Sequence, residues 1–475
     1  MSWKRLAPMV IALTVASWQA CADDATDGAH QKETLHKISA ANAASLQGAI
    51  DANPGRMIFV PQGEYRLDQP LRITTDGTGL YGYGVIIQQN ASVPILLISG
   101  ANDVRIRSLT FRRSNCREMD RANGVVVEQA KNVVLDHIRV RDHKVQGHAI
   151  AIRGCSNCAI RDSEVINYKQ IAIDDRTGNA MQGYAFRCID GTGIYVSNST
   201  GTVISGNRII EQDLLPSKAI QEKYELGRLV PGRHPTVVGE LGKRAVRNGN
   251  YVDLWHQGAA IFVGNPRASR QTLITDNYIE NAAQGIDMHS DNAICSGNTI
   301  HNASIGIKAT HGSRNLILNS NLLAKIDRWG IVLSPGAGSS HSVPAHGTQL
   351  SKPANVDGGT VISNNIITEF GEGYEYWHLG GAYDDRGSSY GIAFLAAQLS
   401  SNPPLRDILV TGNVVYDTTA DEISSASGDP PPRPKYRFAV AIEHEQGKPD
   451  PVGMHFGNNV FHPGTEGISN VELPP

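Results

Sequence analysis

One short pattern recurs along most of the chain: an aliphatic pair, two small polar residues, Asn, any residue, and an apolar residue. Copies begin at Val203, Leu273, Ile294, Ile317, Val361 and Leu409, and a degenerate copy begins at His455. The asparagines at 277, 298 and 321 are 21 and 23 residues apart, and no helical 3.6-residue period lies between them. Such a period is typical of coils made of short strands and tight turns. The repeat therefore predicts an all-β fold, a parallel β-solenoid in which each coil pairs with the next.

A second strand, usually opened by Gly, follows many copies of the repeat. The clearest examples begin at Gly285, Gly306, Gly330 and Gly391. The repeated Asn is interpreted as an internal ladder whose side-chain amides bond the coils above and below. That role is structural, so these asparagines are not candidates for the active site.

These Ile-Ser-Gly-Asn-x-Ile units with Gly-Ile-x-aliphatic strands resemble the right-handed parallel β-helix of the pectate-lyase-like superfamily, over roughly residues 55–465. The resemblance implies a single-domain right-handed β-helix. It also implies an activity from that superfamily's range, which includes polysaccharide lyases, glycoside hydrolases, epimerases and phage tailspikes. Some β-helices of this kind trimerise side by side, so a monomer and a homotrimer both remain open.

The first 22 residues have the pattern of a secretory signal peptide. Lys4 and Arg5 precede an apolar run, and small residues around Cys21 supply a cleavage site. A lipid anchor at Cys21 is the alternative. Either way the sequence predicts a secreted or periplasmic protein.

Residues 23–54 are predicted to form an N-terminal segment ending in a capping helix over 39–53, which Pro54 terminates. Residues 57–60 and 65–67 are then expected as strands separated by a turn at 61–63, and 466–475 as a C-terminal tail. No later apolar stretch reaches the ~20 residues of a membrane-spanning helix.

Charge excludes one class of partner. Lys and Arg total 43 against 46 Asp and Glu, a net charge of −3, so no basic field exists to hold nucleic acid. A polysaccharide, lying along a groove across the coils, is the expected partner.

Four insertions interrupt the coils, near 212–256, 334–358, 371–390 and 424–436. Because a solenoid needs only a turn between strands, such insertions are either tolerated surface loops or walls of a binding groove. The second interpretation assigns substrate contacts to these insertions and to the strands beside them: Arg244, His256, Trp329, Tyr376, Trp377, His378, Asp384, Asp385 and Arg386.

Alignment of the coils gives the candidate catalytic residues. If Ile261, Ile286, Ile307, Ile331 and Ile392 form one interior column, the residue after each points outward. Phe262, Asp287 and Lys308 then share one outer column, with Asp287 and Lys308 about 4.8 Å apart, and His289 and His311 lie beside them. An exposed ion pair without function is the alternative.

A second charged cluster is expected where Glu128, Arg153 and Asp174 each end an apolar run, with Asp175 following. This cluster is either a structural charge ladder or a mixed-charge subsite for a charged sugar.

These residue types suit β-elimination on a uronate-containing glycan. Lys308 or Arg244 would neutralise the substrate carboxylate, and His289 or His311 would transfer the proton. Calcium held by Asp287 and Asp291 is another possible neutraliser. Glycoside hydrolysis by paired carboxylates, Asp287 with Asp291, Asp384 or Asp385, is the alternative. A non-catalytic glycan-binding solenoid is the third interpretation.

Overall fold

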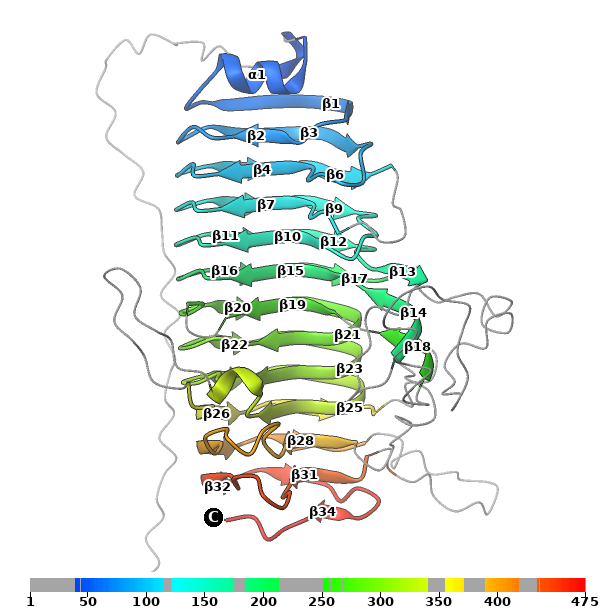
Figure 1. Ribbon diagram of the computed structural model, residues 1–475, viewed down its shortest axis with the longest axis vertical. Helices are drawn as coiled ribbons and strands as arrows, with labels where there is room; N and C mark the ends of the chain where they lie inside the picture. Colours follow the sequence, from blue (N-terminus) through cyan, green and yellow to red (C-terminus); the bar gives the residue numbers. More distant parts are fainter. Residues whose placement is uncertain are drawn as a thin grey trace, which may run out of the picture. The chain divides into compact units, whose positions relative to one another are not determined.

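Parallel pairing between successive coils organises the chain from Met57 to Ser469 (Figure 1). The computed structural model describes residues 39–42, 44–114, 121–173, 184–212, 251–256, 258–265, 268–340, 355–370, 389–417, 434 and 436–474. Side chains are not described over 170–190 and 251–257, nor at 42, 337 and 340. In these ranges 31 strands form one sheet system, wound into three columns, here called A, B and C, and three more strands form a separate sheet.

Column A precedes the repeated Asn in each coil. Its strands are β5 (Arg105–Arg107), β8 (Val134–Asp136), β11 (Ala159–Arg161), β16 (Val203–Ser205), β20 (Leu273–Thr275), β22 (Ile294–Ser296), β24 (Ile317–Asn319), β26 (Gly358–Ser363), β29 (Arg406–Thr411) and β32 (Val452–Gly457). Column B follows the Asn and contains β6 (Thr110–Arg113), β9 (Arg139–Arg141), β12 (Glu164–Ile166), β17 (Arg208–Ile210), β27 (Ile366–Thr368), β30 (Val414–Val415) and β33 (Val460–Phe461).

Column C completes each coil. Its strands are β2 (Leu71–Ile73), β4 (Leu96–Ser99), β7 (Val125–Glu128), β10 (His148–Arg153), β15 (Thr192–Ser197), β19 (Ala259–Gly264), β28 (Tyr390–Phe394), β31 (Phe438–Ile442) and β34 (Gly467–Ser469). Five long strands run through two columns: β1 (Met57–Leu67) and β3 (Gly79–Gln88) through A and B, and β21 (Tyr278–Met288), β23 (Thr299–Thr310) and β25 (Leu322–Ser334) through B and C.

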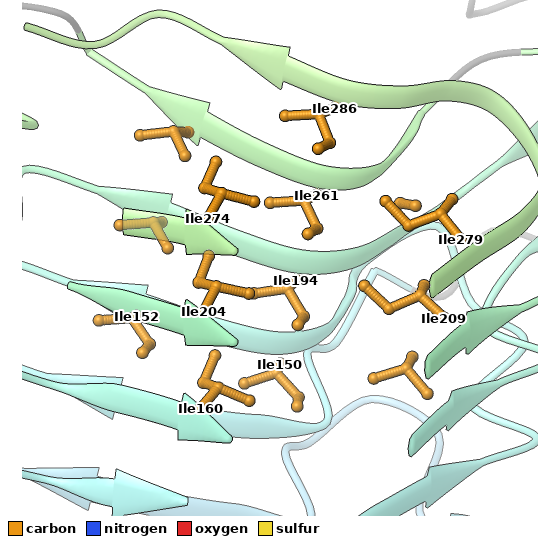
Figure 2. Packing of buried hydrophobic residues seen from close by; sticks show 14 of the residues in the cluster. Ile150, Ile152, Ile160, Ile194, Ile204, Ile209, Ile261, Ile274, Ile279 and Ile286 are labelled. Atoms are coloured by element: carbon orange, nitrogen blue, oxygen red, sulfur yellow. The ribbon is translucent and has the colours of Figure 1, made fainter. Parts of the chain in front are cut away.

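Aliphatic side chains stack in rows inside the coils. Ile194, Ile261 and Ile286 of column C are fully buried, as are Ile204 and Ile274 of column A, and Figure 2 shows them one above another. A fully buried Ile contributes roughly 1.5–3 kcal/mol relative to exposure, so this repeated stack is the main source of stability. The predicted interior column is confirmed by the register, which pairs Ile261 with Ile286 and continues through Ile307.

The predicted Asn ladder is also confirmed. Its members, in order, are Asn207, Asn277, Asn298, Asn321, Asn365, Asn413 and Asn459. Asn277 Nδ2 donates to Asn298 Oδ1 at 2.9 Å, and the backbone N–H of Asn277 donates to the same oxygen at 3.1 Å. Each amide thereby satisfies backbone groups at a turn that would otherwise be buried without partners.

The residue before each ladder Asn adopts a left-handed conformation, which explains the small polar pair in the repeat. Asp276 has φ of 56° and Ser320 has φ of 54°. At Gly297, φ is 68° and an added Cβ would lie 2.4 Å from Asp276 Oδ1 of the preceding coil. Gly therefore follows Asp in this stack because the Asp side chain occupies the space above it.

The N-terminal cap is a helix, but a shorter one than predicted. A 3₁₀ turn, η1 (Ala40–Asn42), precedes α1 (Leu46–Ala52), because the Ser45 side chain accepts from Gly48 N–H and starts the helix there. Gln47 Nε2 donates to the carbonyl of Arg72 at 3.1 Å, and Gln47 Oε1 accepts from the N–H of Arg72 at 2.8 Å. The helix thus supplies the partners that strand β2 lacks on its open edge.

Four other expectations about the coils were wrong. Residues 57–67 form one strand with a register shift between Val60 and Gly63, in place of two strands and a turn. β21, β23 and β25 run continuously through a corner where short separate strands were expected. The predicted C-terminal tail contributes strand β34, and Val471 and Leu473 pack against the core.

The fourth difference is the separate sheet of β13 (Gln170–Ile173), β14 (Tyr184–Asp190) and β18 (Tyr251–His256). It is built from residues between and beyond the coils, which carry no copy of the repeat. Of the predicted insertions, residues 213–250, 341–354, 371–388 and 424–433 lie outside the described residues, and η2 (Ala337–Ser340) belongs to the second one.

Candidate functional site

The outward row of column C carries the candidate catalytic residues in the predicted register. Phe262 pairs with Asp287, Asp287 with Lys308, and Lys308 with Val332. Because Ile286 and Met288 are buried inside the coil, Asp287 between them is directed to the outer face. The structure therefore brings Asp287, Lys308 and His289 to one surface.

Asp287 is the centre of this cluster. Its Oδ2 accepts a hydrogen bond from Lys308 Nζ at 3.1 Å, and its Oδ1 lies 3.1 Å from His289 Nε2. The side chains of Asp287 and His289 are only 10% and 14% exposed, and that of Lys308 is 25% exposed. Within the described residues, neither Asp287 Oδ1 nor His289 Nε2 makes an aligned hydrogen bond. A buried carboxylate with an under-used oxygen is unlike an ordinary solvated surface pair.

Opposing effects set the charge of Asp287. Burial alone would raise the pKa of Asp287, but Lys308 and His289 outweigh it and hold this pKa well below its usual value. The carboxylate is therefore ionised at neutral pH. It fixes Lys308 and His289 and balances positive charge on either one.

His311 completes the cluster from the end of β23. Its ring lies 4.5 Å from that of His289, in an edge-to-face arrangement. Burial, together with the neighbouring His289 and Lys308, lowers the pKa of His311 to about 4, so its imidazole is neutral at pH 7. The N–H of Gly338 donates to His311 Nδ1 at 3.3 Å, which places the ring proton on Nε2.

An aromatic row leads along the coils to this cluster. Phe262 lies 5.0 Å from the His289 ring and 5.4 Å from Tyr195, and Tyr195 stacks on His148 at 4.1 Å. The Arg153 guanidinium lies 5.6 Å from the centre of the Tyr195 ring. Four coils thus present aromatic side chains and a cation on one surface, an arrangement suited to contacts with sugar rings.

Tyr195 and His148 were not among the predicted site residues. The segment Gly193-Ile194-Tyr195-Val196 has the Gly-Ile-x-aliphatic pattern of the second strand. Extending the coil alignment by one coil toward the N-terminus finds Tyr195 directly beside Phe262, as the register shows. No comparable signal marks His148.

The second predicted cluster is only partly assembled. Glu128 and Arg153 pair in adjacent coils, but the next coil presents Ser197 in this row. The strand before Asp174, β13, pairs with β14 in the separate sheet, so the place of Asp174 in this row stays a prediction. Asp174 itself lies outside the described residues.

Of the other predicted substrate contacts, Trp329 and His256 lie on strands that the structure describes, and the rest do not. Trp329 lies on β25 and packs beside the apolar cluster of Val332, Tyr390 and Phe438, which makes that end of the surface apolar. His256 ends β18 of the separate sheet, and nothing is described of its side chain. The remaining residues lie outside the described residues: Asp175, Arg244, Tyr376, Trp377, His378, Asp384, Asp385 and Arg386.

Asp291, one of the two predicted calcium ligands, is paired with an arginine. Asp291 Oδ2 accepts from Arg314 Nε and Nη2, both at 3.2 Å, and Asp291 Oδ1 accepts from Asn355 at 3.1 Å. Both carboxylates of the predicted calcium site, Asp287 and Asp291, are thus neutralised by a basic side chain. Calcium binding there stays a prediction.

One group of three potential metal-ligand side chains occurs in the described part of the chain. Asp136, His137 and Asp162 place their ligand atoms within 4.8 Å of one another at the end of β8 and the matching turn of the next coil. Arg107 already contacts Asp136 at 3.2 Å. This group lies on column A, away from the outward row of column C.

A buried carboxyl supports the turn that holds His311. Asp357 Oδ1 accepts from the N–H groups of Gly312 at 2.8 Å and Ser313 at 3.0 Å, and Ser339 donates to Oδ2. Burial raises the pKa of Asp357 to about 7. The stability contributed by the protonated carboxyl is therefore fully present below its usual pKa of 3.8 and is lost as the pH rises through about 7.

Replacing Asp357 with Asn should remove this dependence, because the amide keeps an acceptor for the turn but does not ionise. We expect the urea midpoint of the wild type to fall more between about pH 5 and about pH 8 than that of Asp357→Asn. Equal changes in the two proteins would show that Asp357 does not change its protonation over this range.

Comparisons with known proteins agree with the observed fold. The model of a family described as "Right handed beta helix region" matches residues 74–220. A search of curated proteins found no match. Within the described residues, no helix is long and apolar enough to cross a membrane.

Solved structures match over most of the chain. An exopolygalacturonase from Thermotoga maritima superposes with a TM-score of 0.51 at 11% identity, covering 86% of this chain and 85% of that one. The A-module of the mannuronan C-5 epimerase AlgE6 from Azotobacter vinelandii gives a TM-score of 0.44 at 13% identity, covering 92% of this chain and all of that one. At these identities the likeness concerns the fold. This chain therefore has the fold of a right-handed parallel β-helix.

Proposed function

We propose that this protein is a polysaccharide lyase that cleaves a uronate-containing glycan by β-elimination. The observation that carries the proposal is the cluster of Asp287, Lys308 and His289 on the outer face of column C, joined by contacts of 3.1 Å. The Thermotoga maritima protein that shares the fold is named an exopolygalacturonase, and we carry over a polymer of this kind as the substrate class. The same residues are the ones selected from the sequence.

Lys308 suits the first task, which is to neutralise the uronate carboxylate. An ammonium group has three N–H donors, and Asp287 uses one of them. The remaining donors can bind the substrate carboxylate and stabilise the negative charge that develops when the neighbouring proton is removed.

His289 suits the second task, which is proton transfer. The Asp287 carboxylate beside Nε2 favours the tautomer with its proton on Nε2, so Nδ1 carries the lone pair. Nδ1 can take the proton from the carbon next to the carboxylate. The resulting imidazolium is stabilised by Asp287 and can return this proton to the glycosidic oxygen as the carbon–oxygen bond breaks and the double bond forms.

His311 is better suited to binding than to proton transfer. Its pKa of about 4 makes it a weak base, and its Nδ1 already accepts from Gly338. Its Nε2–H can donate to a hydroxyl or carboxylate of the sugar. Phe262 and Tyr195 provide aromatic contacts for the next sugars along the coils.

Hydrolysis is the second candidate and requires two carboxyl groups about 5–9.5 Å apart. Asp287 would need a partner, and Asp291 is held by Arg314 and Asn355. Asp384 and Asp385 lie outside the described residues. The contacts on column C therefore support elimination more directly than hydrolysis.

The proposal is tested by incubating the protein with a panel of uronate polymers and following the absorbance of unsaturated chain ends. We expect a steady rise with wild type and a loss of about two to three orders of magnitude in Lys308→Ala, because one electrostatic contact to the reacting carboxylate is removed. Lys448→Ala is the matched control, since Lys448 is also ion-paired, to Glu445 at 2.6 Å, but on a loop after β31.

Each other outcome selects an alternative. Reducing ends without this absorbance would show hydrolysis. Binding without turnover on every polymer would show a glycan-binding solenoid.

A further inference from the structure

A pocket on the outer face of column B lies apart from the cluster of Asp287. Its volume is about 330 Å³. It is lined by Val85, Thr110, Arg112, Arg139, Arg141 and Asp142, from β3, β6, β9 and the residue after β9. This volume is at the lower end for small-molecule sites. The site proposed above is on column C, so the mechanism uses none of these residues.

The register places arginines of adjacent coils side by side. Arg112 pairs directly with Arg141, and Thr110 pairs with Arg139 two residues earlier on the same face. Like charges directly opposite each other on neighbouring strands destabilise a sheet. The sequence nevertheless places two guanidinium groups opposite each other and a third within the same pocket.

The carboxylates beside the pocket carry less negative charge than the arginines carry positive charge. Arg112 contacts Asp142 at 3.5 Å. Arg139 and Arg141 share a single oxygen, Oε2 of Glu164, at 3.3 and 2.8 Å. Within the described residues around the pocket, three guanidinium groups thus face two carboxylates.

The next coil adds further positive charge. Arg208 pairs in register with Glu164, on the side opposite Arg139. Burial pushes the pKa of Glu164 upward, but Arg141, Arg139 and Arg208 outweigh it and lower this pKa overall. The potential around the pocket is therefore positive, although the whole chain carries a net charge of −3.

We propose that this pocket is a second binding site, selective for an oxyanion: the carboxylate, sulfate or phosphate group of an acidic ligand. Planar guanidinium groups bind such anions with paired hydrogen bonds. The side chains of Arg112, Arg139 and Arg141 are 44%, 56% and 45% exposed, so a ligand can reach them from solvent. A bound anion would relieve the repulsion between Arg112 and Arg141. The inference does not depend on the proposed lyase activity.

Isothermal titration of the full protein at low ionic strength tests this site with three probes: sodium sulfate, sodium phosphate and sodium galacturonate. We expect saturable binding of at least one probe and roughly tenfold weaker binding in Arg141→Gln, because one charge-assisted contact is lost. Arg66→Gln is the matched control: Arg66 is exposed and paired with Glu64 at 2.6 Å on β1. This control should bind like the wild type.

A second substitution is expected to change the affinity for the anion in the opposite direction. Glu164→Gln should bind the anion more tightly than wild type, because the carboxylate that occupies Arg139 and Arg141 is removed. The preferred probe identifies the source of the anion: galacturonate a glycan, and sulfate or phosphate an ester group or the free ion.

Two results would overturn the proposal: Arg141→Gln and Arg66→Gln binding all probes equally, or sodium chloride at matched ionic strength competing completely. His289→Ala should keep the binding of this anion, which separates the pocket from the proposed active site.

Discussion

Replacing His289 with Ala is expected to lower the rate of β-elimination by about two to four orders of magnitude, because general base catalysis contributes that much to proton transfer. The expected loss is in kcat, with a smaller change in KM, since His289 acts on the reacting proton while Phe262 and Tyr195 are the proposed contacts for the sugar rings. Initial rates of unsaturated product over a range of substrate concentrations measure both quantities.

His301→Ala provides the control for this substitution. His301 lies on β23 and, like His289, contacts an acid, Glu280 at 4.0 Å, but it belongs to column B. We expect its rate to equal that of wild type. If His289→Ala retains more than about a tenth of the wild-type rate, another group takes the proton and the assignment of the base is wrong.

Replacing Asn298 with Ala is expected to cost about 3–5 kcal/mol of the free energy of unfolding, because several buried partners lose their hydrogen bonds. Asn298 Nδ2 donates to Ile274 O and Asn321 Oδ1, both at 2.9 Å. Asn298 Oδ1 accepts from both the backbone N–H and the side chain of Asn277. Urea denaturation followed by circular dichroism measures the loss.

Asn459→Ala is the matched control at the last rung of the ladder. Asn459 accepts from Asn413 and donates to Val410 O, but it is half-buried, so water can replace part of what is lost. We expect a loss of about 1 kcal/mol. Equal losses at Asn298 and Asn459 would contradict the interpretation that burial of the ladder sets its contribution.

The coils were predictable because their signal repeats. Each copy of the pattern fixes an interior Ile, a left-handed turn residue and a ladder Asn, so an error in one copy is corrected by its neighbours. The same alignment gave the outward row, and with it the proximity of Asp287 to Lys308 and His289. The alignment could not predict how deeply the cluster is buried. An exposed ion pair was the alternative, yet the Asp287 side chain is only 10% exposed.

The features that were missed do not repeat. The sheet of β13, β14 and β18 is formed by segments outside the pattern, so nothing in the coil period predicted it. The continuous strands β21, β23 and β25 were expected as short separate strands, although their segments contain residues such as Asn281 and Lys325 at the corner. Both take left-handed φ values, 60° and 58°, yet the strand continues through them.

Mass spectrometry of the oligosaccharides released from a uronate polymer tests the central claim most directly. Elimination leaves one chain end with a carbon–carbon double bond and adds no water, whereas hydrolysis adds one water molecule for each bond that is broken. We predict products that carry the unsaturated end from wild type and none from His289→Ala. Fully hydrated products from the wild type would contradict the account and identify the surface around Asp287 as that of a hydrolase.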